Sequence, residues 1–261
     1  MNNNVASYRV WLGCAVLLVG IGPMCSVVRA QGKFSIVKTV HFDVRYQRGI
    51  VEEDAQKVAD FLQQDYQYLS TKLGIDLKRS LEVRIYDSVN KFLAEARVQK
   101  PWRGGIYQRR VLYLQPVTAL VTRGIFEQTL LYELSMAVLD EASRKGCPLW
   151  LMESFAVYHS GEMANLSEPY GVRVTQFADL EQDIQEYHDP PQRSDVHYVL
   201  GRTMKFFVER YGEDKTLSMF AAFDGALSTD AIFQKVFNEK STVIEKAWAE
   251  YIGTHSPKFP R

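Results

Sequence analysis

The period of the apolar residues changes along the chain, and each period predicts a different element. Apolar and polar residues alternate from Ile36 to Tyr46, with Val40 on the apolar side, which predicts one half-buried strand. Between Val51 and Leu73 the apolar residues recur at steps of three and four, which predicts an amphipathic helix that ends at Gly74. A strand is therefore followed by a long helix.

A second strand, a short helix and a hairpin come next. Alternation over residues 81–85 predicts a strand, and Asp87 or Ser88 can cap a helix that runs through Ala96. Gly104-Gly105 opens a turn, and two short apolar runs flank a polar break, which predicts a β-hairpin over residues 104–114.

After Gly124 the strand signals fade and the chain is helical, with breaks at 146–148, 169–171, 189–191 and 212. Strands first and helices after them predict an α+β fold. No repeat or linker rich in glycine and serine follows Gln31. We therefore expect one compact unit, with a mainly α/β lobe over residues 31–118 and a mainly helical lobe over residues 119–261.

Residues 1–30 are typical of an export signal. Arg9 precedes an apolar run from Val10 to Val28, and Val28-Arg29-Ala30 places small residues where a signal peptidase cleaves. We expect a chain that starts at Gln31 and is exported to the periplasm or out of the cell. An uncleaved membrane anchor is the alternative, because the run is just long enough to span a bilayer.

Composition narrows the class of partner. Removal of residues 1–30 would leave 29 basic against 31 acidic residues, so nucleic acid is not expected as a partner. Cys147 would be the one remaining cysteine, so no internal disulfide is expected. The hydrophobic content of 46% is that of an ordinary globular protein whose stability comes from its core.

Two strongly apolar segments lie close together in the second half. The stretch from Phe126 to Leu139 predicts a buried helix. Pro148 begins a second apolar helix, at a first helical position where its missing N–H costs nothing. On these patterns alone, both segments are helices of the core.

Their sequences resemble the peptidase MA-like family of gluzincins, whose pattern is tL-x-HExxH-avl and then P-x-WL-x-EG-x-A-x-y. The matching stretches are Gln128-Thr-Leu-Leu-Tyr-Glu-Leu-Ser-Met-Ala-Val-Leu139 and Pro148-Leu-Trp-Leu-Met-Glu-Ser-Phe-Ala-Val-Tyr158. Shorter likenesses extend it over most of the chain after Gln31, at residues 105–107, 111–116, 198–201, 206–212 and 248–251. The resemblance implies a zincin-like peptidase domain.

The resemblance also implies a role for each matching residue. In an active gluzincin, two histidines on one helix face bind zinc, the glutamate after the first activates water, and a later glutamate completes the site. At these positions the chain has Tyr132 and Met136 for the histidines, Glu133 for the general base and Glu153 for the third ligand. Ser154 replaces the usual glycine after that ligand.

The replacement of the two histidines by Tyr132 and Met136 changes the expected metal chemistry. A thioether is a poor ligand for zinc, and a phenol, with a pKa of about 10, must lose its proton to bind well. We therefore predict no zinc and no other cofactor, with Tyr132 and Met136 filling the vacated site by packing. Zinc is expected only if ligands come from elsewhere.

Each retained polar residue also has a structural interpretation. Glu133 can pair with a cation or accept a hydrogen bond from Tyr132 or Ser135, and Glu153 suits a cleft-facing role or a buried ion pair equally. Tyr198 can serve as an oxyanion donor near the cleft or as half-buried packing.

The histidines do not suggest a replacement metal site. His41 lies on the polar side of its predicted strand, and His159 lies roughly 240° around the helix from Glu153. His188 and His197 are separated by two prolines and match no spacing of metal ligands. We expect structural roles for these residues.

Three functions remain open. The first is an exported pseudopeptidase that binds a peptide or protein partner in a cleft around Tyr132, Glu133, Met136 and Glu153. The second is a weakly active zinc metallopeptidase, and the third is a structural protein of the cell envelope. The two substituted histidine positions favour the first. Membrane contact is expected only if residues 1–30 are kept as an anchor.

Overall fold

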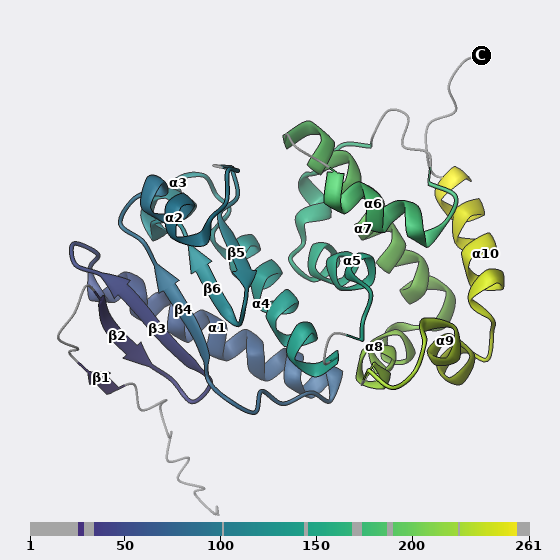
Figure 1. Ribbon diagram of the computed structural model, residues 1–261, viewed down its shortest axis with the longest axis horizontal. Helices are drawn as coiled ribbons and strands as arrows, with labels where there is room; N and C mark the ends of the chain where they lie inside the picture. Colours follow the sequence, from purple (N-terminus) through teal and green to yellow (C-terminus); the bar gives the residue numbers. More distant parts are fainter. Residues whose placement is uncertain are drawn as a thin grey trace, which may run out of the picture.

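The computed structural model describes residues 26–28, 34–100, 102–143, 146–168, 174–186, 190–223 and 225–254. A mixed sheet with helices forms the first part and a mostly helical region forms the second, which confirms the α+β class (Figure 1). Within the described residues, no helix is long and apolar enough to cross a membrane. The predicted signal lies outside them, apart from residues 26–28.

The sheet has the strand order β1-β2-β3-β4-β6-β5. Its strands are β1 (Ser26–Val28), β2 (Phe34–Lys38), β3 (Phe42–Gln47), β4 (Leu81–Ile85), β5 (Gly105–Gln108) and β6 (Val111–Leu114). The pairs β3–β4 and β4–β6 are parallel, and the other neighbours are antiparallel. Cleavage after Ala30, which stays a prediction, would remove β1 and leave five strands.

The prediction of one strand from Ile36 to Tyr46 is wrong, because the chain turns back between β2 and β3. The Thr39 amide donates to the Phe42 carbonyl at 2.9 Å, and the Phe42 amide donates to Oγ1 of Thr39 at 3.1 Å. Val40 stands at the tip of this turn with 78% of its surface exposed. Its place in the alternation therefore did not indicate burial.

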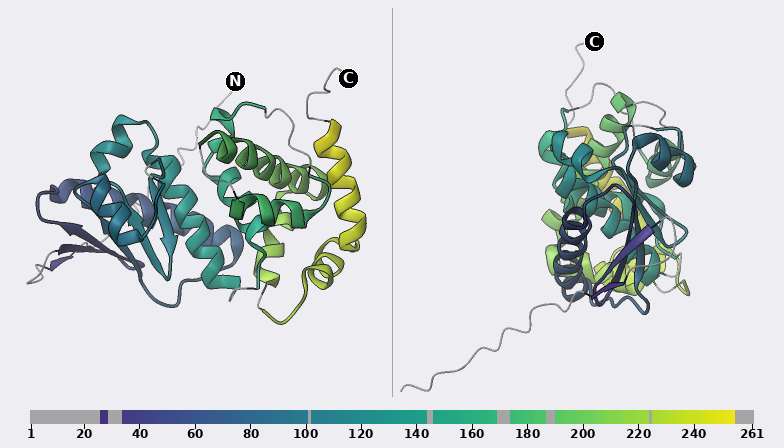
Figure 2. Two further views of the ribbon diagram at one scale, coloured as in Figure 1. Left: turned by 45° about the horizontal axis from the view of Figure 1, so that its top comes forward. Right: turned by 90° about the vertical axis from the view of Figure 1, so that its left-hand side faces the viewer.

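Helices cover both faces of the sheet. The predicted long helix is α1 (Glu52–Leu73), which lies along one face and ends at Gly74 with a φ of 64° (Figure 2). Helix α2 (Val89–Ala96), capped by the Ser88 hydroxyl, packs on the other face. Strand residues alternate between the two cores, with Leu112 on the α1 side and Tyr113 on the α2 side.

The predicted hairpin is confirmed as β5 and β6, and β5 is the last strand of the sheet. Two helices follow it, α3 (Val117–Thr122) and α4 (Phe126–Ser143). Helix α4 stands between the sheet and the helical part, where it packs against α1, β5 and α5 (Leu149–His159) (Figure 1). It is the central helix of the molecule.

The rest of the chain forms a helical layer around α5 and α7. Its elements are η1 (Glu162–Asn165), α6 (Phe177–Glu186), α7 (Pro190–Tyr211), α8 (Glu213–Ala222), α9 (Thr229–Phe237) and α10 (Ser241–Thr254). Packed aromatic rings join them: Trp150 of α5 stacks on Phe177 of α6 at 4.3 Å, and Phe177 contacts Trp248 of α10 at 4.8 Å. These contacts join α5, α6 and α10, and α5 packs in turn against both α4 and α7.

Candidate functional site

A pocket of about 110 Å³ opens where the edge of the sheet meets α4, η1 and α7. The loop before β5 and the start of α4 form one wall, and η1 and α7 form the other. The charged and polar side chains that line it include Arg103, Arg123, Tyr132, Glu133, Glu162 and Arg193. Two of the residues expected from the sequence, Tyr132 and Glu133, therefore lie in one pocket.

Glu133 is held by the edge strand. Strand β5 bonds to β6 through alternate residues, so the Tyr107 amide points away from β6. This amide donates to Oε2 of Glu133 at 2.7 Å. The hydrogen-bond donor to Glu133 is thus neither Tyr132 nor Ser135. The Ser135 hydroxyl instead donates to the Leu131 carbonyl at 2.7 Å.

The close approach of β5 to α4 depends on two residues without side chains. A Cβ atom on Gly104 would lie 2.5 Å from Oγ1 of Thr129, and one on Gly105 would lie 3.1 Å from Cγ of Glu133. Glycine at these positions lets the backbone reach the carboxylate. Burial nevertheless raises the pKa of Glu133, against the opposing effects of the Arg103 charge and the Tyr107 hydrogen bond.

Tyr132 is buried with one polar atom unsatisfied. Its ring stacks on the His197 ring, with centroids 5.6 Å apart and an angle of 11° between the planes. Only 6% of the residue is exposed, and its hydroxyl has no hydrogen-bond partner among the described residues. A buried hydroxyl without a partner is unfavourable, so this position is not optimised for packing alone.

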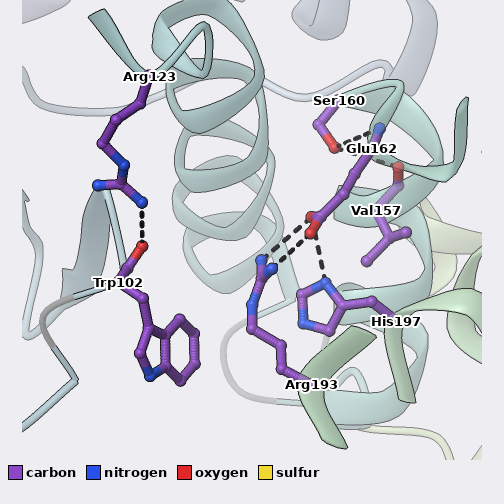
Figure 3. A network of polar contacts seen from close by, with 7 residues as sticks. All are labelled: Trp102, Arg123, Val157, Ser160, Glu162, Arg193 and His197. Atoms are coloured by element: carbon purple, nitrogen blue, oxygen red, sulfur yellow. Dashed lines mark hydrogen bonds and ion pairs between the residues drawn. The ribbon is translucent and has the colours of Figure 1, made fainter. Parts of the chain in front are cut away.

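Glu162 is the centre of a buried ion-pair network (Figure 3). Arg193 donates to both of its carboxylate oxygens, at 2.5 and 3.1 Å, and Nδ1 of His197 lies 3.1 Å from Oε2. Burial by itself would raise the pKa of Glu162, but the contacts with His197 and Arg193 outweigh it and lower the pKa. Glu162 is therefore an ionised, fully paired carboxylate.

His197 is a neutral member of this network. Burial, assisted by the Arg193 charge, lowers its pKa to about 4. In the tautomer with hydrogen on Nδ1, it donates to Glu162 while its ring supports Tyr132. The Arg193–Glu162–His197 group thus fixes the wall of the pocket opposite β5.

Glu153 has a different environment. It lies on α5 with 6% of its surface exposed, and its Oε2 atom has no hydrogen-bond partner in the described parts of the chain. Burial raises its pKa to about 7, although the charges of Arg103 and Arg193 oppose this rise. Glu153 does not line the pocket, and its carboxylate forms no ion pair within 4.0 Å with any of those residues.

The other two expected residues are placed outside the pocket lining. Met136 is partly buried on α4 and packs against the main core. Tyr198 lies on α7 next to His197, and its half-buried ring has the charged groups of Glu168 and Arg202 nearby. The structure brings together Tyr132 and Glu133 in the lining of the pocket, and Met136 and Tyr198 are not among the residues that line it.

Cationic side chains gather at the mouth of the pocket. Arg123 donates to the Trp102 carbonyl at 2.6 Å (Figure 3). It also donates to Oε1 of Gln115 at 3.2 Å. The Lys100 ammonium and the Arg193 guanidinium lie 5.6 and 5.5 Å from the centre of the Trp102 ring. The pocket is therefore lined by cations and two carboxylates together.

The residues around Glu133 and Glu153 do not fit zinc. Within the described ranges, no group of three or more His, Cys, Asp or Glu side chains is placed to hold a metal ion. A phenol and a thioether stand at Tyr132 and Met136, and both are poor zinc ligands. The nearby guanidinium of Arg193 would also repel a divalent cation.

A second buried histidine lies behind α4. His159 is stacked between Tyr68 and Phe155, and its Nδ1 atom is 3.1 Å from the Ser135 hydroxyl. Its Nε2 atom is 3.8 Å from Oδ1 of Asp65. Ser135 is completely buried within its helix, so this Ser-His-Asp arrangement offers no accessible nucleophile.

Several site residues were missed from the sequence. Arg103, Arg123, Glu162 and Arg193 were not singled out, and His197 was assigned only a structural role. Arg193 and His197 lie one helical turn apart, a spacing that places them on one face of α7. Their shared partner is 31 and 35 residues away, so the spacing could suggest a pair but not its target. His188 lies outside the described residues.

Comparison with known proteins gives one match. The model of the Peptidase MA superfamily matches residues 62–254, which include α4, α5, η1 and α7. A search of curated proteins found no match. The matched region contains every residue of the pocket described above.

Proposed function

The chain belongs to the Peptidase MA superfamily, and we propose that it is a non-catalytic member that binds a peptide segment of a protein partner. The observation that carries this proposal is the pair Tyr132 and Met136 on α4, which we place at the two zinc-binding histidine positions of the superfamily. Export from the cytoplasm is part of the same proposal and rests on the character of residues 1–30.

The surroundings of the general-base position support a binding role. A base that activates water must present its carboxylate to that water. The Tyr107 amide donates to Oε2 of Glu133 at 2.7 Å, which ties one of the two carboxylate oxygens to β5. Glu133 therefore acts in the proposal as a link between β5 and α4 that shapes the pocket.

The pocket itself suits an extended segment rather than a folded surface. It is small, about 110 Å³, and a neighbouring hollow of about 420 Å³ shares Gln128 with it. The hollow is lined by apolar residues such as Phe126 and Leu131 and by charged and polar residues such as Lys57, Glu127 and Asn165. A few consecutive residues of a peptide would fill both, with side chains in the larger hollow.

Metal analysis of the purified protein, with zinc titration, tests the non-catalytic assignment. The matched comparison is the Tyr132→His, Met136→His double variant. We expect the unmodified protein to hold zinc far below one ion per chain and to release it on dialysis. Stoichiometric zinc that survives dialysis in the unmodified protein would overturn the proposal.

The double variant locates the cause of the loss. If it binds zinc and cleaves a generic peptide, the loss of activity lies at Tyr132 and Met136. If it binds no zinc, the guanidiniums of Arg103 and Arg193 also disfavour a cation at the site. In that case we expect Arg193→Gln, added to the double variant, to raise zinc uptake.

A weakly active hydrolase is the second candidate, and one observation favours it. Glu153 is buried and its pKa is raised to about 7, a value suited to proton transfer at neutral pH. In that case Glu153→Gln would abolish a measurable peptidase activity, and the activity would respond to added zinc. Absence of cleavage by the unmodified protein, with and without added zinc, would exclude this candidate.

A further inference from the structure

The lining of the pocket carries more positive than negative charge. Three guanidiniums line it, those of Arg103, Arg123 and Arg193, against the carboxylates of Glu133 and Glu162. The Glu162 carboxylate is already paired with Arg193 and His197 inside the wall. Within the lining, guanidiniums outnumber carboxylates by one even when both carboxylates are ionised, and by two if Glu133 keeps its proton.

Arg123 is the clearest source of this surplus. Its guanidinium donates to two neutral oxygens, the Trp102 carbonyl and Oε1 of Gln115, and it forms no ion pair with any described residue. These two hydrogen bonds hold the planar group in a fixed orientation at the pocket. A guanidinium that is fixed but not neutralised is ready to bind an anion.

Tyr132 supplies a second unused donor. It lines the same pocket with only 6% of its surface exposed, and its hydroxyl has no partner among the described residues. The ring is held by stacking on His197 rather than by the hydroxyl. Donation from this hydroxyl to a ligand acceptor would break no hydrogen bond with the described residues.

We propose that this pocket binds a carboxylate, with Arg123 and the Tyr132 hydroxyl as the donors. The proposal rests on the proposed peptide-binding function and names the group that anchors the peptide. The carboxylate is the C-terminus of the peptide or the side chain of an aspartate or glutamate. Residues next to it extend into the hollow around Phe126 and Leu131, which shares Gln128 with the pocket.

The charge of the walls favours a carboxylate over a phosphate. A dianion would lie against Glu133 and Glu162, whereas a single negative charge matches the surplus of one guanidinium. A planar carboxylate also matches the planar fork of Arg123. Gly104 and Gly105 line the pocket and add no side chain to it.

Retention of acetylated hexapeptide pools on the immobilised full-length protein, measured by mass spectrometry, tests the proposal. One pool lacks Asp and Glu and has free C-termini, a second is its C-terminally amidated counterpart, and a third is amidated but contains one Asp or Glu. We expect the first pool to be retained about tenfold more than the second, as a charge-assisted hydrogen bond implies. Retention of the third pool alone would identify a side-chain carboxylate as the ligand.

The failures are distinguishable. Equal retention of the three pools would overturn the carboxylate proposal and leave peptide binding standing. Retention of none would overturn both the carboxylate and the peptide-binding proposals.

Two variants and a matched control link the effect to the pocket. Arg123→Gln should lower retention of the preferred pool about tenfold, and Tyr132→Phe should lower it by about threefold. The melting temperature of Tyr132→Phe should not fall, because the deleted hydroxyl has no partner in the free protein. Arg79→Gln, at an exposed arginine outside the pocket, should bind like the unmodified protein. Unchanged retention in both pocket variants would overturn the assignment.

Discussion

Two buried glutamates beside the pocket differ in almost everything except their burial. Glu162 on η1 is 3% exposed and Glu153 on α5 is 6% exposed. Glu162 has a bidentate arginine and a histidine, and its pKa is lowered. Glu153 has an oxygen without a hydrogen-bond partner among the described residues, and burial raises its pKa to about 7.

The difference shows that partners, rather than depth, decide the charge state of a buried carboxylate. Glu162 is ionised and contributes to the rigid wall of the pocket, since each of its contacts favours the charged form. Glu153 keeps its proton up to neutral pH, at a cost to stability above it. A buried carboxyl whose Oε2 atom has no hydrogen-bond partner among the described residues lowers stability once it ionises.

Removing Arg193 should have the largest effect on this comparison. Arg193→Met leaves Glu162 buried with one partner, and loss of one member of a buried ion pair costs about 3–5 kcal/mol of unfolding free energy. Urea denaturation at pH 7 measures it. The Arg193→Met, Glu162→Leu double variant should recover much of the loss, and a single-variant loss below about 1 kcal/mol would contradict the importance of the pair.

Glu153→Gln should change the pH dependence of stability. The unfolded chain loses the proton near its ordinary pKa of 4.5, whereas the folded protein keeps it to about 7. The unfolding free energy of the unmodified protein therefore falls as pH rises through this window, by roughly 3 kcal/mol in all. The variant should lack this fall, so that it is the more stable protein at pH 8. Parallel stability curves from pH 4 to 8 would count against the raised pKa.

Gly105→Ala tests Glu133, which has one hydrogen bond and so lies between the two extremes. The added Cβ would lie 3.0 Å from Cδ2 of Leu114 and 3.1 Å from Cγ of Glu133, which pushes β5 away from α4. We expect a loss of about 1–3 kcal/mol in thermal or urea unfolding. Gly253→Ala, on α10 with no atom within 4 Å, is the matched control and should not lose stability.

Lys205→Met should have the smallest effect. Lys205 and Glu209 form an ion pair one helical turn apart on α7, with side chains 44% and 49% exposed. Such pairs contribute about 0.5 kcal/mol or less. A loss of more than about 1 kcal/mol in unfolding free energy would contradict the view that this exposed pair contributes much less than the buried Arg193–Glu162 pair.

Much of the fold could be predicted from local patterns. The helix α1, the strand β4 and the β5–β6 hairpin have clear periods and clear ends, such as Gly74. The turn between β2 and β3 could not, since Val40 continues the alternation although it is 78% exposed. Alternation reports which side of a strand a residue occupies, and it is silent on whether the strand continues.

The site divides in the same way. Tyr132, Glu133 and Glu153 could be selected because the resemblance fixes their spacing on two adjacent segments. Glu162 and Arg193 could not, because their contact depends on how η1 and α7 pack, 31 residues apart in the chain. The donor to Glu133 is the backbone amide of Tyr107, and a backbone contact cannot be predicted from the type of residue at that position.

The placement of the tryptophans has an optical consequence. Trp150 and Trp248 are buried in the helical part, whereas Trp102 is half-buried in the pocket wall between the cations of Lys100 and Arg193. Among the described indoles, only Trp102 lines the pocket, so a molecule that enters there changes the polarity and charge around a single emitter. Intrinsic fluorescence can therefore follow occupancy in real time without a dye, with Trp102→Phe as the reference that keeps only the emission of the other tryptophans.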